Sequence, residues 1–157
     1  MSYQMLQKVE ELRKELLRLS EVFRASRNQP DVAEWLERHE RTLEVFSATV
    51  KEDPQSIKEN LDLAFWLTNI GTFLLEHDLE ASMPYFIHGV AVLQEFNSGR
   101  SEHPRIAHGL FEAQGALAQA LELRGQPADL ERAQDLKDHN NRLSRKYEKE
   151  FAAIEMV

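Results

Sequence analysis

The chain has 157 residues, no cysteine and a formal net charge of -8, with 19 lysine and arginine residues against 27 aspartate and glutamate residues. This length predicts a single domain, 1–157, and the missing thiols exclude disulfides and cysteine chemistry. The acidic balance argues against nucleic acid as a partner, because binding a phosphate backbone requires clustered lysine and arginine.

Neither the first residues nor the most apolar stretch predicts a membrane protein. The N-terminal residues MSYQMLQKVEEL carry charges and lack the apolar core of a signal peptide. The most apolar run, Leu61 to Leu75, is interrupted by Asp62 and Asn69 and is shorter than the about 20 apolar residues of a spanning helix. We therefore expect a cytoplasmic protein that does not bind membranes.

Two amphipathic helices are predicted in residues 1–52, from about Tyr3 to Ala25 and from about Pro30 to Lys51. Their apolar positions alternate at spacings of four and three, which is typical of helices that pack along a seam. The seam residues are Met5, Val9, Leu12, Leu16, Leu19 and Phe23, then Val32, Leu36, His39, Leu43, Phe46 and Val50. His39 is either a hydrogen-bonded core histidine or a pH-responsive or ligand-binding group.

The run from Leu61 to Leu75 lies in the third predicted helix, which starts at a cap on Asp53 or Ser56 and reaches about Glu76. A helix that is apolar on nearly every side must be covered on several sides. The run is therefore expected to form the central helix. Gly71 in its interior predicts the close approach of another backbone.

Three more helices are predicted after the central one. Asp78 can cap the fourth, which ends near Phe96, and the fifth runs from about Pro104 to Arg124. Gly125 ends the fifth helix, and the sixth runs from Pro127 to about Glu155. At about 1.5 Å per residue, the sixth helix would be the longest, and its end is expected to extend beyond the domain.

These signals predict an all-α fold of six helices in three consecutive antiparallel hairpins, because short turns place successive helices side by side. The first hairpin occupies residues 1–52 and the other two occupy 53–157. The pattern leaves two arrangements open, a right-handed array of repeats or an irregular six-helix bundle.

The third and fifth helices share a repeated pattern: Leu63, Ala64 and Leu67 align with Ile106, Ala107 and Leu110. Around them, about half of the chain resembles tetratricopeptide (TPR) repeats of the kinesin-light-chain type, from about Leu63 to Leu143. The matching features are Pro84-Tyr85, Gly99, Glu102, His103-Pro104 and Ala107, followed by the turn at Leu123-Arg124-Gly125. The long last hairpin departs from the repeat.

The TPR resemblance implies a non-enzymatic module that binds a peptide or a partner protein in a helical groove. In such repeats an asparagine shortly before the glycine of the first helix binds the peptide backbone, and Asn69 stands two residues before Gly71. The equivalent position in the fifth helix is Glu112, so Gln114 and Gln119 could supply amides instead. Alternatively, Asn69 makes a buried hydrogen bond between the third and fifth helices.

A homodimer is a further expectation. Asn140 and Tyr147 lie on the seam of the long sixth helix, where a polar residue can fix the register of a coiled coil. If the end of this helix pairs with a second copy, these residues contribute to oligomerisation. The alternative is that Asn140 is partly exposed and faces no helix.

No catalytic signature is present, so we predict that the protein is not an enzyme and has no cofactor. No Glu-x-x-His or His-Glu-x-x-His motif suggests a metal. Asp135 and His139 are four residues apart and could share a metal, but a single such pair is common by chance. The alternative to a partner-binding module is a structural or oligomerising bundle, such as a regulatory subunit or a secretion chaperone.

Overall fold

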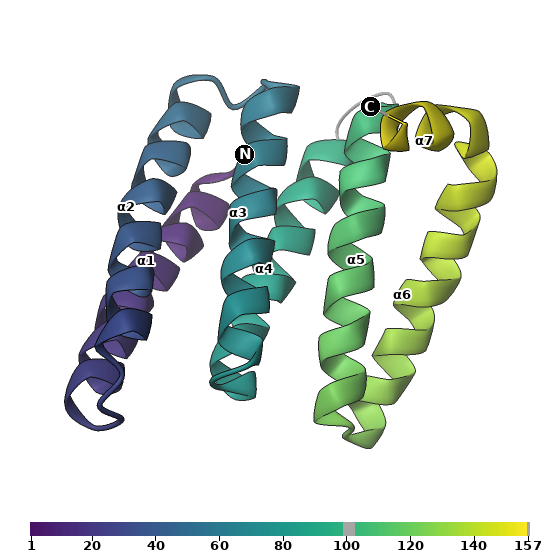
Figure 1. Cartoon of the computed structure of the whole chain (residues 1–157). Coiled ribbons are helices and arrows are strands. Elements are labelled where there is room, and N and C mark those ends of the chain that lie inside the picture. Colours follow the sequence, from purple (N-terminus) through teal and green to yellow (C-terminus); the bar gives the residue numbers. More distant parts are fainter. Residues whose placement is uncertain (99–102, 157) are drawn as a thin grey trace. The chain divides into compact units, whose positions relative to one another are not determined.

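The computed structural model describes residues 1–98 and 103–156, and these residues form seven α-helices and no strand (Figure 1). The predicted all-α class is confirmed. The helices are α1 (Tyr3–Ala25), α2 (Pro30–Glu52), α3 (Ile57–Leu75), α4 (Leu79–Ser98), α5 (Pro104–Arg124), α6 (Pro127–Lys146) and α7 (Glu148–Glu155). Gly99 and Glu102, which carry part of the TPR resemblance, lie outside the described residues.

The contacts divide the chain into two compact units, Met1–Leu63 and Ala64–Val157, and the boundary lies inside α3. In the first unit, α1 and α2 form an antiparallel pair (Figure 1). The predicted seam supplies its core: Val9, Leu12, Leu16, Leu19, Phe23, Leu36, Leu43 and Val50 are all buried. Asn28 has a φ of 51° in the turn, a left-handed conformation that asparagine tolerates.

Arg13 joins the two helices of the first unit electrostatically. Its guanidinium lies 2.8 Å from Glu40 Oε1 and 3.0 Å from Glu44 Oε2, both on α2, and 2.7 Å from Glu10 Oε2 on α1. The hydrogen bonds to Glu10 and Glu40 raise the pKa of Arg13 against the opposing effect of burial. Because Glu40 is itself buried, Arg13 supplies the charge that lets this carboxylate lie between the helices.

Ser56 and Asp78 cap the N-termini of α3 and α4, and both are among the predicted caps. The Glu59 amide donates to Ser56 Oγ at 3.2 Å, so Ser56, not Asp53, caps α3. The Ala81 amide donates to Asp78 Oδ1 at 3.1 Å, which confirms the predicted cap of α4. A short polar side chain suits both positions because it accepts from an amide that has no partner in the first turn of a helix.

Glycines allow α3 and α4 to pack closely in the second unit. The nearest atoms to a Cβ added at Gly71 would belong to the ring of Phe86, at 3.1 Å, so a side chain lies over this glycine. The close approach to a backbone occurs at Gly89 of α4 instead. A Cβ there would lie 2.8 Å from Thr68 Oγ1 and 3.3 Å from the carbonyl oxygen of Ala64.

Helix α5 contacts α4, α6 and α7 within the second unit. Its buried face is rich in alanine, which lets neighbouring helices approach: Ala107, Ala113, Ala118 and Ala120 are buried beside Ile106, Leu110, Leu117 and Leu121. Gly125 ends the helix with a φ of 73°, as predicted. Arg124 then donates two hydrogen bonds of 2.7 Å to the Asp129 carboxylate and holds the pKa of Asp129 below its usual range.

The prediction of one long helix from Pro127 to Glu155 is wrong. The helix breaks at Tyr147, and α7 packs on α5 instead of extending beyond the domain (Figure 1). Apolar burial explains the break, because Tyr147 and Phe151 are covered in a cluster with Ala107, Phe111 and Leu143. In the part of the chain that the structure describes, no helix is long and apolar enough to cross a membrane.

Candidate functional site

The residues predicted to bind a partner differ in their exposure. Asn69 on α3 is half-buried, whereas Glu112 and Gln119 on α5 are exposed. Glu112 and Gln119 are seven residues apart and therefore share one face of the helix. The fourth predicted residue, Gln114, is fully buried. Three of the four side chains thus have surface to offer a partner, and Gln114 has none.

Phe65 is the feature of α3 that the sequence pattern did not predict. Its side chain is 62% exposed, although the helix was expected to be covered on several sides. The ring meets Trp66 edge-on, with centroids 5.9 Å apart and planes at 80°. Phe65 precedes Asn69 by four residues, so an exposed aromatic ring and a half-buried amide share one face of the helix. The four-residue spacing in the sequence could have indicated that Phe65 lies on the same face as Asn69.

Gln114 forms a buried polar network between α5 and α6. Its Nε2 donates to Asn140 Oδ1 at 2.7 Å, and Asn140 Nδ2 donates to the carbonyl oxygen of Phe111 at 2.9 Å. His139 Nδ1 lies 3.0 Å from Nε2 and 3.1 Å from Oε1 of the same Gln114 amide. The expectation that Asn140 is partly exposed and faces no helix is therefore wrong. A role for Asn140 in oligomerisation stays a prediction.

Acidification is expected to destabilise the protein through His139. Burial, and next the charge of Arg142, lower the pKa of His139 below its ordinary value of about 6.5. At a pH between the lowered pKa of His139 in the folded protein and its ordinary pKa in the unfolded chain, the unfolded chain binds more protons than the folded one. The free energy of unfolding therefore falls as the pH drops below about 6.5. Burial also lowers the pKa of His39, whose Nδ1 lies 2.9 Å from the Trp35 carbonyl oxygen.

Urea unfolding at about pH 7 and about pH 5.5 checks this expectation. H139Q should reduce the difference in unfolding free energy between the two conditions, and H39Q should remove a further part. Equal pH dependence in H139Q and the parent protein would contradict the assignment.

Tyr147, the second residue predicted for oligomerisation, belongs to an aromatic cluster at the junction of α6 and α7. Its ring stacks on Phe151 at a centroid distance of 5.7 Å, and Phe151 lies 5.5 Å from Phe111 and 5.0 Å from His108 on α5. His108 Nε2 also lies 3.2 Å from Glu155 Oε1 and 3.5 Å from Glu112 Oε1. These contacts hold α7 against α5 within the chain.

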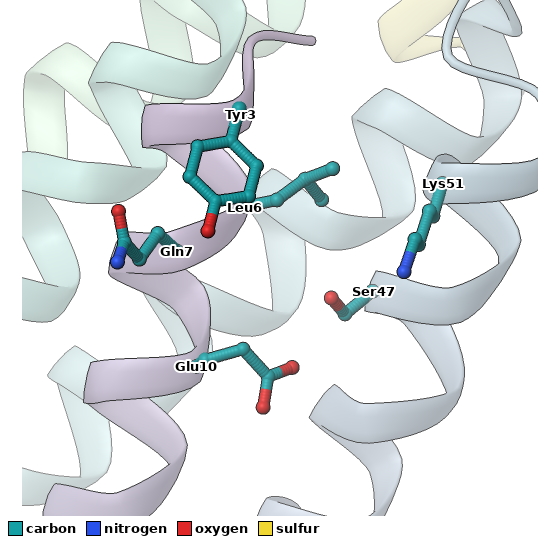
Figure 2. Close-up of a pocket in the computed structure, with 6 residues that line it drawn as sticks. All are labelled: Tyr3, Leu6, Gln7, Glu10, Ser47 and Lys51. Atoms are coloured by element: carbon teal, nitrogen blue, oxygen red, sulfur yellow. The ribbon is translucent and has the colours of Figure 1, made fainter.

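A pocket of about 280 Å³ opens between α1 and α2. Figure 2 shows its lining: Tyr3, Leu6, Gln7 and Glu10 from α1, and Ser47 and Lys51 from α2. The lining places the charged groups of Glu10 and Lys51 beside the apolar side chain of Leu6, but Glu10 already pairs with Arg13. The volume lies just below the about 300–1,000 Å³ of typical ligand sites. We therefore do not take this pocket as the main candidate site.

No protein-family model, curated protein or solved structure matches the chain. Among residues 1–98 and 103–156, no group of three or more histidine, aspartate or glutamate side chains is placed to hold a metal ion. The face of α3 that carries Phe65 and Asn69 is thus the candidate site with the clearest chemistry, an aromatic contact beside an amide.

Proposed function

We propose that this protein is a non-enzymatic interaction module that binds a segment of a partner protein on the face of α3 carrying Phe65 and Asn69. The exposure of Phe65 carries the proposal. A large exposed aromatic ring offers apolar area to a partner, and aromatic residues are enriched at the centres of interfaces. An adjacent amide both donates and accepts hydrogen bonds, so Asn69 can pair with the backbone of an extended peptide whatever its sequence.

The TPR-like arrangement belongs to the same proposal. In such an array the first helices of successive hairpins, here α3 and α5, line one concave surface. Asn69 would then share that surface with Glu112 and Gln119, which are exposed on α5. The net charge of -8 favours a partner segment that carries basic residues beside its apolar anchor.

Selection of binders from a random peptide library, followed by titration of the best peptide, tests this function. F65A is expected to weaken binding by about tenfold or more, the effect of removing an aromatic anchor, and N69A to weaken it less. Both variants should unfold at unchanged temperature, because neither side chain fills the core.

L123A is the matched control, since Leu123 is also 62% exposed but lies at the far end of α5. The peptide should bind L123A as tightly as the parent protein. If F65A binds equally well, or if L123A is the variant that loses binding, the face of α3 is not the recognition surface.

A further inference from the structure

The break between α6 and α7 occurs in a sequence that favours a continuous helix. No glycine or proline follows Pro127, and residues 145–149 read Arg-Lys-Tyr-Glu-Lys. Tyr147 has a φ of -114° and a ψ of 29°. Helical bonds persist on both sides of it: the Tyr147 amide donates to the Leu143 carbonyl at 3.0 Å, and the Phe151 amide donates to the Tyr147 carbonyl at 2.8 Å. The departure from the helix is therefore confined to about one residue.

Contacts with α5, not local preference, hold α7 in its folded-back position. Phe151 is 4% exposed and packs on Phe111 and His108, while Glu155 lies beside the imidazole of His108. If the helix straightened in an isolated chain, Phe151 would lose this cover and the apolar surface on α5 would be exposed to water. A straight helix thus requires a second surface of the same kind.

We propose that a second copy of this chain supplies that surface, by exchange of α7 between two subunits. In the exchanged dimer α6 and α7 form one helix from Pro127 to Glu155, and each Phe151 packs on the α5 of the other subunit. The exchange remakes the contacts of Phe151 and Glu155 and adds regular helical geometry at Tyr147. Such an exchange is a low-cost route to a dimer, and its population rises with protein concentration.

The absence of cysteine in the sequence permits a direct test with engineered single thiols. Glu112 and Glu155 both reach the imidazole of His108, at 3.5 and 3.2 Å, so thiols at these positions lie within reach of a short bismaleimide. E112C and E155C are mixed at high concentration, warmed to allow exchange, cross-linked, and analysed by denaturing gel and mass spectrometry. Exchange predicts a covalent heterodimer of the two variants.

Two controls make the result decisive. The double variant E112C/E155C, cross-linked at high dilution, should close within one chain, which verifies the geometry. The mixture of E122C and E155C is the matched control, because Glu122 is exposed on the same helix but ten residues further along. A heterodimer yield from E112C and E155C no greater than from this control overturns the proposal. Failure of the dilute double variant to close also overturns it, because α7 would then not lie on α5.

E148G provides an independent readout by sedimentation or light scattering at increasing concentration. A glycine inside the straight helix of each subunit should lower the association constant of the dimer by about tenfold. At the first residue of the separate α7 the same glycine costs less. An unchanged or higher association constant contradicts the continuous helix. Neither experiment includes a partner peptide, so the outcome is independent of the proposed recognition face.

Discussion

Replacing Gln114 by leucine is expected to lower the free energy of unfolding by about 1–3 kcal/mol, the cost of leaving a buried polar group without its partner. The two side chains are similar in size, so the loss reports on polarity and not on a cavity. Asn140 Oδ1 accepts from Gln114 at 2.7 Å and would lose this donor in a site that is almost closed to water. Urea unfolding followed by circular dichroism measures the change.

The companion variants separate the network from the position. Q119L lies on the exposed face of the same helix and should change stability by no more than about 0.5 kcal/mol. The double variant Q114L/N140L removes both partners and should recover part of the loss. If Q114L is as stable as the parent protein, the buried amides do not contribute to joining α5 and α6.

Replacing Gly89 by alanine is expected to destabilise the protein through a packing penalty of about 1–3 kcal/mol, the typical effect of forcing atoms into a filled interior. The added Cβ would lie 2.8 Å from Thr68 Oγ1 and 3.3 Å from the carbonyl oxygen of Ala64, and a backbone atom cannot rotate away. α3 and α4 must therefore separate slightly. The helix preference of alanine over glycine, about 1 kcal/mol in the opposite direction, offsets part of this penalty and leaves a net loss of stability of up to about 2 kcal/mol.

G115A is the control for this experiment. A Cβ at Gly115 would meet only Asn140 Nδ2, at 3.8 Å, so alanine there should stabilise the protein by about 0.5–1 kcal/mol.

In the double variant G89A/T68A the nearest obstructing atom is gone, and part of the stability should return. Thr68 Oγ1 is the one buried side-chain polar atom among the described residues without a hydrogen-bond partner, so its removal alone should cost little. Stabilisation by G89A would refute close packing at this point.

Helices α1 to α5 were predictable because local chemistry defines them. Tyr3–Ala25 and Pro104–Arg124 have the expected bounds, and proline at the first position with glycine after the last fixes the ends of α5. The cap of α3 was open between Asp53 and Ser56, and only the structure selects Ser56. The TPR-like arrangement stays a proposal, because how helices pack depends on contacts between residues far apart in sequence.

Positions at which tertiary contacts overrule local preference could not be predicted. Residues 127–155 carry every signal of one helix, and the break at Tyr147 arises because Phe151 packs on Phe111 of α5. Burial could not be assigned within an apolar run either, so Phe65 was grouped with residues that are covered. Gln114 was predicted to face a partner because its amide suits a peptide, yet the same chemistry serves an internal hydrogen bond to Asn140.

The boundary between the two compact units falls between Leu63 and Ala64, within the continuous helix α3. A protease that cleaves only non-helical segments would find no cleavage site at this junction. Neither half can be excised cleanly, because a cut before Ile57 removes a helical segment from the first half and a cut after Leu75 removes one from the second. Hydrogen exchange along α3 should therefore report two rates of opening within one rod, slow or fast according to the half to which each turn belongs.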